Sequence, residues 1–360
     1  MSGTARPDEA RPDGARPDDH GRRFWTWVWW RVYALVGGAV ILWITFWAWT
    51  ALPLWLVGAA VVSPWLPGRW RPLRLLCLLL LHLTLESLVL LSLFGLWIGS
   101  GFGWRIRSPF FQWCHYDAMK WYLGHVFAGA TRVLNLIIRT VGPTPDAFPG
   151  DPLIVLSRHA GPGDSFIVVH ALMNTYGREP RIVLKNTLAW EPTVGILMHR
   201  LPNRFVSPNP KPGHDLRAQI SQLASGLDSD DALLIFPEGG NFTPARRERA
   251  IARLRGLGLD QMAEKAAEWT HVLAPRPGGV AAAFAAAPEA DVLLCAHTGL
   301  DHLTTVADLW RWLPMDKQLT LRWWRVPRSE IPTSRDGVAA WLFTEWARID
   351  RWIDENREQP

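Results

Sequence analysis

The sequence has few cysteines and lacks several familiar catalytic signatures. Among its 360 residues only Cys77, Cys114 and Cys295 are cysteines, and their dispersion indicates neither a disulfide framework nor a zinc site. A glycine-rich loop ending in Gly-Lys-Ser/Thr, a His-Glu-x-x-His motif and a Gly-x-Ser-x-Gly elbow are all missing. These absences argue against a nucleoside triphosphatase, a zinc protease and a serine-dependent hydrolase.

Charge is missing from long stretches of the N-terminal third. No Asp, Glu, Lys or Arg occurs between Arg31 and Arg69, and Glu86 is the only such residue from Leu75 to Trp104. A bilayer span needs about 20 apolar residues, so each stretch can enter a membrane. Of 23 tryptophans, 14 precede residue 122 and many flank these stretches, as expected for indole rings at the headgroup level.

We therefore expect a membrane-anchoring helical segment at 22–104. Prolines divide it into a first span near 32–52, a re-entrant or interfacial piece, and a second helix near 75–98. Arginines flank every boundary, so a full crossing and a shallow hairpin in one leaflet both remain open. Within the second helix, His82 and Glu86 share one face, either as a functional pair or as a packing contact.

The remaining segments differ in composition. Repeats of Ala-Arg-Pro-Asp predict a disordered tail at 1–21, and residues 105–145 predict an amphipathic bridge along the membrane interface. The formal net charge of +5 suits binding to anionic lipid headgroups. The sequence has no aromatic RNA-binding motif, so a nucleic acid partner is not indicated.

From residue 146 to residue 360 the pattern is that of an α/β domain with a mainly parallel sheet. Apolar runs alternate with helical stretches, and in such sheets functional sites gather at the carboxyl ends of strands. We expect strands at 152–157, 181–185, 232–237, 271–274, 291–296 and 318–326, and helices at 163–177, 187–200, 213–227, 243–257 and 335–355.

A histidine and an aspartate follow the first of these strands. Among 11 histidines only His159 has an aspartate, Asp164, five positions later. The intervening Ala-Gly-Pro-Gly turn allows the carboxylate to reach the imidazole. Asp164 would then fix the ring tautomer while His159 takes a proton from a hydroxyl. A histidine that merely caps a turn is the alternative.

A second motif, Phe236-Pro237-Glu238-Gly239, ends another buried strand. Glu238 could bond substrate hydroxyls or brace the loop, and the Gly239 amide could face a developing oxyanion. The alternative is a tight turn that needs glycine for its backbone angles.

Three cations follow predicted strands or begin short runs. They are Lys185, Arg204 and Arg276, and at strand ends they could hold an acidic phosphate.

At these residues the chain resembles the 1-acylglycerol-3-phosphate acyltransferase superfamily, whose members carry His-x-x-x-x-Asp and Phe-Pro-Glu-Gly in this order. The resemblance covers about 150–355 and is closest to eukaryotic long-chain lysophospholipid acyltransferases. It rests further on three stretches: Glu238 to Thr243, with Asn241 among them; His271 to Arg276; and Ile331-Pro332 followed by Trp341-Leu342.

The resemblance implies transfer of a fatty acyl group from acyl-CoA or acyl-carrier protein to the hydroxyl of a lysophospholipid such as lysophosphatidic acid. It implies His159 as base, Asp164 as its partner, and Glu238 with Gly239 shaping the acceptor site. Phe236, Pro237, Asn241 and Thr243 would contribute to substrate binding. No metal, cofactor or covalent acyl-enzyme is implied.

Two departures from the family pattern stand out. The family commonly has Thr-Arg after Glu-Gly, where the arginine holds the acceptor phosphate, and here these positions are Gly240 and Asn241. Arg158 also precedes His159, where asparagine is usual. Without that arginine, the candidate ligands of the acceptor phosphate are Lys185, Arg204 or Arg276.

We expect a membrane location with the catalytic domain on the cytoplasmic face. Two other functions stay open: a catalytically altered lipid-binding or scaffold protein of the same fold, and a membrane-anchored lipid hydrolase that uses water as nucleophile. The acceptor headgroup, the chain length and the oligomeric state are left undetermined by the sequence.

Overall fold

A computed structural model describes residues 18–66, 70–142, 150–161, 163–206, 215–299, 310–311, 313 and 315–357. Most of the tail expected at 1–21 lies outside these residues, although the first helix already begins at Asp18. The helices are α1 Asp18–Thr50, α2 Leu52–Val62, α3 Arg71–Gly99, α4 Pro109–Leu134, α5 Asp164–His170, α6 Pro192–Arg200, α7 Leu216–Ala224, α8 Pro244–Gly256, α9 Asp260–Glu268, α10 Pro277–Ala286 and α12 Arg335–Asn356. Short helical turns lie at Ser63–Trp65, Ala171–Thr175, Asn186–Trp190 and Arg328–Glu330.

Seven strands form one sheet in the order β1-β7-β6-β2-β5-β3-β4. They are β1 Leu136–Val141, β2 Leu153–Ser157, β3 Glu179–Lys185, β4 Arg204–Val206, β5 Asp231–Ile235, β6 Asp291–Thr298 and β7 Lys317–Val326. All neighbouring strands are parallel except β6 and β7, so β7 and β1 run against the other five. The expected α/β fold with a mainly parallel sheet is confirmed.

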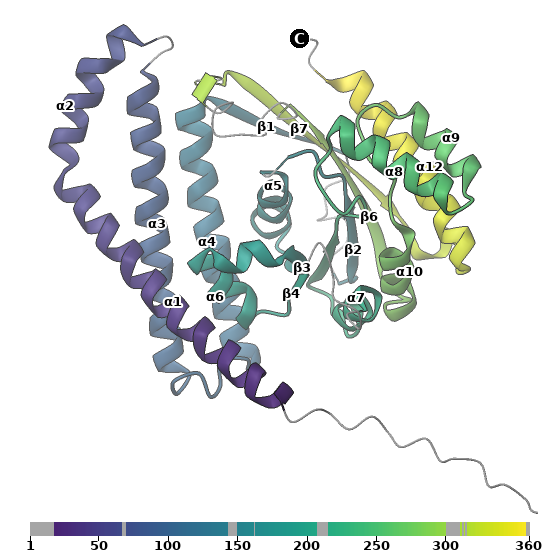
Figure 1. The fold of residues 1–360 in the computed structure, drawn as a ribbon, viewed down its shortest axis with the longest axis horizontal. Coiled ribbons are helices and arrows are strands. Elements are labelled where there is room, and N and C mark those ends of the chain that lie inside the picture. The colour runs from purple at the N-terminus through teal and green to yellow at the C-terminus, as the bar shows by residue number, and fades with distance from the viewer. Residues whose placement is uncertain are drawn as a thin grey trace, which may run out of the picture.

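Helices cover both faces of the sheet, as Figure 1 shows. On one face α3, α4, α5 and α6 pack over side chains such as Leu153, Val155 and Leu234. On the other face α7, α8, α9, α10 and α12 pack over the alternate positions, including Ile154 and Leu233. The central strands are therefore buried on both sides, which is why their sequences are continuously apolar rather than alternating.

Two helices are long and apolar enough to cross a membrane by length and composition, Arg31–Thr50 within α1 and Arg71–Gly99. They lie side by side at one side of the molecule (Figure 1). Many α1 side chains are exposed, such as Trp43 and Trp47. The later part of α3 instead packs into the sheet-side core through Val89 and Leu93. The apolar helix α3 is thus joined to the α/β domain by direct packing.

The ionisable pair in α3 forms a contact within its own helix. His82 Nε2 lies 3.0 Å from Glu86 Oε2, and the Glu86 side chain is buried. Glu191, which caps α6 by accepting the Val194 N–H, is a close neighbour of Glu86. Burial together with Glu86 raises the pKa of Glu191 to about 9. These groups mark the junction between α3 and the α/β domain and favour the packing alternative for His82 and Glu86.

The segment 105–145 differs from the amphipathic bridge that its sequence suggests. Helix α4 buries Tyr116, Met119 and Leu123 against the sheet while Trp113 stays exposed, so it is a layer of the domain. After it the chain enters β1, which pairs in parallel with β7. An edge strand with partly exposed positions carries too weak an apolar pattern to stand out from an amphipathic helix.

One predicted strand is wrong, and two helices were not predicted. Residues 271–274 form an irregular buried segment, in which the His271 N–H donates to Asp350 of α12 at 2.6 Å. Burial of Val272 and Ala274 in the core explains the apolar run without any strand pairing. Helices α9 and α10 were absent from the expected set.

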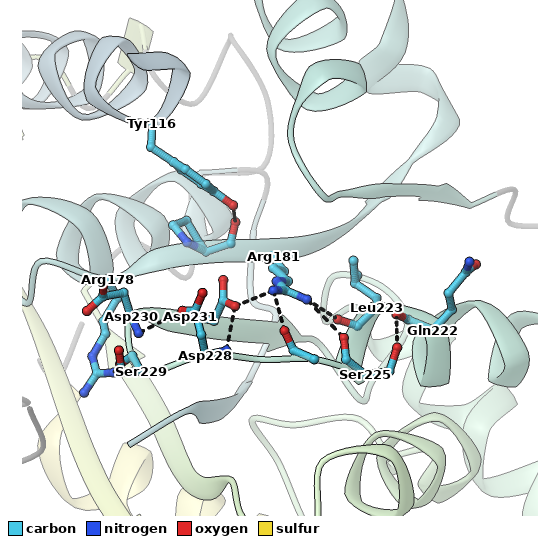
Figure 2. Close-up of polar contacts among 12 residues, drawn as sticks. Tyr116, Arg178, Arg181, Gln222, Leu223, Ser225, Asp228, Ser229, Asp230 and Asp231 are labelled. Carbon is cyan, nitrogen blue, oxygen red and sulfur yellow. Dashed lines mark hydrogen bonds and ion pairs between the residues drawn. The ribbon is translucent and has the colours of Figure 1, made fainter. Parts of the chain in front are cut away.

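Figure 2 shows a polar network at the amino ends of β3 and β5. Arg181 of β3 forms an ion pair with Asp231 of β5, and Arg178 donates to the Asp151 carbonyl at 2.8 Å. Tyr116 of α4 donates to the carbonyl of Pro180 at 3.3 Å. Arg181 also donates to the carbonyls of Leu223, Ser225 and Gly226. This network fixes the end of the sheet opposite the predicted motifs.

Candidate active site

The two predicted motifs emerge at the same edge of the sheet. Strands β2 and β5 are parallel neighbours, with Leu153 opposite Ala232 and Leu156 opposite Ile235. The turn after β2 therefore lies beside the turn after β5. Their backbones are joined directly, because the Phe242 N–H donates to the His159 carbonyl at 2.7 Å. The sheet itself thus brings the two motifs together, as predicted.

His159 and Asp164 form the expected pair. His159 Nδ1 lies 3.6 Å from Asp164 Oδ2, and the His159 side chain is 11% exposed while that of Asp164 is 3% exposed. The same oxygen accepts the Gly161 N–H, which orients the carboxylate from the turn. The Nδ1 side of the imidazole faces this carboxylate at ion-pair distance, and the ring keeps a small exposed surface, a geometry that suits a general base.

A second imidazole reaches the same carboxylate. His297, at the carboxyl end of β6, places its Nε2 3.6 Å from Asp164 Oδ2. Burial raises the pKa of Asp164, but His297, His159, the Gly161 N–H and Arg158 together outweigh burial and lower the pKa below its ordinary value. Asp164 is therefore an anion at neutral pH, despite being buried.

Arg158 is a buried cation at the centre of the site. Its Nη1 donates to the His297 carbonyl at 2.9 Å, and the residue is 2% exposed. It lowers the pKa of both Asp164 and Glu238. The arginine in place of the family's usual asparagine therefore favours the ionised form of two buried carboxyl groups.

Glu238 points into the protein and braces the loop. Its Oε1 accepts the His159 backbone N–H at 3.4 Å and the Trp346 indole N–H at 3.3 Å. Burial raises the pKa of Glu238 to about 8, although Arg158 and these hydrogen bonds lower it. Of the two roles left open by the sequence, the contacts favour loop bracing over a hydrogen bond to substrate hydroxyls.

The turn after β5 needs its glycine. Gly239 has a φ of 71°, a left-handed conformation that side chains with Cβ rarely adopt. Its N–H donates to the Phe236 carbonyl at 3.0 Å and so closes the turn. This amide is engaged inside the loop, which corrects the expectation that it faces an oxyanion.

The other motif residues shape the wall around His159. The Phe236 ring lies against the imidazole, with centroids 4.7 Å apart. The Pro237 carbonyl accepts the Arg276 N–H at 2.9 Å. Thr243 caps α8 by accepting the Arg246 N–H at 3.2 Å.

Cations flank the turn 238–241. Arg246 Nη1 donates to the Asn241 carbonyl at 2.9 Å and lies against Gly240, whereas the exposed Arg276 guanidinium lies beside Gly239. Burial and then Arg246 lower the pKa of Lys185, which places these two cations near each other. Arg246 was not among the predicted cations, although its position in the first turn after the Thr243 cap was a usable signal.

Arg204 is not brought to this turn. It lies at the start of the edge strand β4, opposite Val183, and its Nη2 donates to Gln222 of α7 at 2.7 Å. The register places it two residues before the end of β4, since Val206 is the residue opposite Lys185. Its predicted phosphate contact is therefore not supported by the geometry.

No group of three or more His, Cys, Asp or Glu in the described ranges is arranged to hold a metal ion. The cysteines among these residues are free, and Cys295 is buried within β6 beside the site. The chemistry that the residues can supply is proton transfer by an oriented imidazole and recognition of an anion by clustered cations.

Comparison with known proteins places this arrangement in context. Residues 139–295 match the family model described as Acyltransferase. A curated protein of the fission yeast Schizosaccharomyces pombe, described as an uncharacterized acyltransferase, is 23% identical over 184 residues, which is 48% of this chain and 50% of the relative. The chain thus spans about half the length of that relative.

Among solved structures, the 1-acyl-sn-glycerophosphate acyltransferase PlsC from Thermotoga maritima is similar, with a TM-score of 0.45 and 14% sequence identity. The match covers 75% of this chain and 98% of the PlsC chain.

Proposed function

Because residues 139–295 match the family model described as Acyltransferase, we propose that this protein transfers a fatty acyl group from a thioester to the hydroxyl of a lysophospholipid. The observation that carries the proposal is the His159–Asp164 pair, held in a turn whose neighbour is flanked by Lys185, Arg246 and Arg276. An oriented base beside an anion-binding rim is what acylation of a phosphate-bearing alcohol requires.

The reaction follows from one proton carrier. His159 removes the proton from the acceptor hydroxyl as its oxygen attacks the thioester carbonyl. The tetrahedral intermediate then collapses, the carbon–sulfur bond breaks, and the departing sulfur takes the proton from the imidazolium. Asp164 stabilises the positive ring between these steps, and no enzyme nucleophile, metal or cofactor is required in this scheme.

This chain lacks the arginine that the family pattern has after Glu-Gly, and Arg246 supplies a cation near that position. The missing arginine corresponds to Asn241, and the Arg246 guanidinium bonds the carbonyl of that residue from α8. Lys185 and Arg276 complete the rim, so the proposed acceptor is an acidic lysophospholipid such as lysophosphatidic acid. Acyl-CoA and acyl-carrier protein are both suitable donors.

The two long apolar helices support a membrane location for this reaction. A lysophospholipid partitions into a bilayer, and α3 connects the apolar segment to the core beneath the site through Val89 and Leu93. We place the catalytic domain on the cytoplasmic side, where coenzyme A thioesters and carrier proteins are found.

The test is thiol release by the purified full chain in phosphatidylcholine vesicles. Each donor, palmitoyl-CoA or palmitoyl-carrier protein, is supplied alone, with lysophosphatidic acid, or with lysophosphatidylcholine. The proposal expects acceptor-dependent release with formation of the diacyl lipid. Thiol release that does not depend on the acceptor identifies a hydrolase. Lysolipid binding without thiol release from either donor identifies a lipid-binding protein. Both outcomes refute the proposal.

A further inference from the structure

One carboxylate oxygen in the site lies at ion-pair distance from two imidazoles. Asp164 Oδ2 lies 3.6 Å from His159 Nδ1 and 3.6 Å from His297 Nε2. The side chains of Asp164 and His297 are each 3% exposed, so this contact is shielded from solvent. An electrostatic interaction in such surroundings is stronger than the same interaction at the surface. His297 therefore interacts directly with the Asp164 carboxylate, whose negative charge stabilises protonated His159.

The elements around Asp164 define its electrostatic surroundings. Arg158 and His159 come from the end of β2, and Cys295 and His297 come from β6. Burial raises the pKa of the Cys295 thiol far above its ordinary value, so the thiol stays neutral. Arg158 also interacts electrostatically with Glu238, which lies in the turn after β5. Glu238 accepts the indole N–H of Trp346 from α12.

The fold gives His297 a fixed position. It belongs to the fully buried strand β6, where Ser157 of β2 lies opposite Cys295 and Leu321 of β7 lies opposite His297. Its carbonyl accepts the Arg158 guanidinium at 2.9 Å. Because strand pairing fixes the backbone of His297 and the side chain is 3% exposed, the ring has a defined place beside the carboxylate.

We propose that His297 is a positioning residue that holds the Asp164 carboxylate against the His159 ring and, by its own protonation, controls how readily His159 accepts a proton. The proposal rests on the function proposed above. His297 acts through Asp164 and makes no contact with substrate in this account.

The consequence concerns proton binding by the two rings. With one proton shared between them, a single positive charge faces the Asp164 anion. A second proton puts two cations beside that anion and beside Arg158, which is unfavourable. A proton on one ring therefore opposes a proton on the other. The acid limb of the rate profile accordingly falls in two steps rather than one.

The experiment compares two substitutions at His297. His297→Gln keeps an N–H near the position of Nε2 but cannot ionise, whereas His297→Leu removes the donor. The matched control is His271→Gln, because His271 also pairs with an aspartate, Asp354, at 3.1 Å, but on α12. The rate with lysophosphatidic acid and palmitoyl-CoA is measured from pH 5 to 9 for each protein.

The Gln variant is expected to keep kcat at its optimum within about threefold and to show an acid limb with a single step, while the wild type and the control show two steps. The Leu variant is expected to lose about tenfold in kcat with an unchanged KM. A folded Leu variant with wild-type kcat overturns the proposal. So does an acid limb of the same shape in the wild type and the Gln variant.

A second readout does not depend on turnover. The His159 ring is followed by NMR in histidine-labelled protein in detergent micelles, with His159→Ala to assign its signal. The proposal expects a two-step titration in the wild type and a single step in His297→Gln. Identical single-step curves overturn it. If the wild type transfers no acyl group, the proposed function fails, and this titration still decides the role of His297.

Discussion

Glu238→Gln tests the electrostatics of the site most quantitatively. The pKa of Glu238 lies near 8 in the folded protein because burial outweighs Arg158 and the hydrogen bonds, against 4.5 for an ordinary glutamate. Each pH unit between these values corresponds to about 1.4 kcal/mol, so ionised Glu238 costs the folded state up to about 5 kcal/mol. The cost is absent below pH 4.5, grows as the pH rises, and is complete above pH 8.

The glutamine variant removes this dependence because it cannot ionise. Its Oε1 can still accept the N–H groups of His159 and Trp346. Its amide brings an additional buried donor, at a cost of about 2 kcal/mol. The variant should therefore be less stable than the wild type by about 1 kcal/mol near pH 5 and more stable by about 3 kcal/mol near pH 9. The two stability curves should cross near pH 6.

The assay is urea unfolding in mild detergent, followed by tryptophan fluorescence at several pH values. Glu264→Gln on the exposed surface of α9 is the matched control and should differ from the wild type by a constant amount at every pH. Parallel curves for Glu238→Gln and the wild type would show that Glu238 is ionised in the folded protein at neutral pH, and the reasoning would be refuted.

Two further predictions concern the rim and the opposite end of the sheet. Arg246→Gln should raise the KM for lysophosphatidic acid about tenfold with little change in kcat, because one charge-assisted hydrogen bond is lost; Arg249→Gln on the same helix is the control, and an equal KM in both would contradict the assignment. At Glu179, burial and then Asp231, Asp228 and Asp230 raise the pKa to about 7. Because its pKa is raised, ionisation of Glu179 destabilises the fold as pH rises from 4.5 to 7, so Glu179→Gln should gain about 1 kcal/mol above pH 7, allowing for solvent screening, and nothing near pH 4.5 in urea unfolding. A gain that does not depend on pH would argue against this origin.

The sequence predicted those parts of the fold whose signal is local and strong. The apolar runs of β2, β5 and β6 are buried on both faces, so they stood out from their surroundings. Residues 271–274 carry the same apolar signal but pack as an irregular segment beneath α12, and periodicity alone cannot separate the two cases. The edge strand β1 was not predicted for the opposite reason, because its partial exposure weakens the apolar pattern in its sequence.

The site shows the same division between local and tertiary information. His159 with Asp164, and Glu238 with Gly239, lie close together in the sequence, and the parallel pairing of β2 with β5 then joins the two motifs. His297 comes from a strand in which every residue is buried, so nothing near it in the sequence separates a supporting histidine from the rest of the core. Its role depends on the sheet order, which placed β6 beside β2.

The central claim is that the imidazole of His159 is the base that activates the acceptor hydroxyl. The measurement that tests it most directly is the rate of diacyl lipid formation by the wild type and by His159→Ala, determined by mass spectrometry in vesicles containing lysophosphatidic acid and palmitoyl-CoA. Loss of a positioned base predicts a fall of about 10² to 10⁴ in kcat, with the variant still bound to the vesicles. A variant that forms product at the wild-type rate would contradict the account.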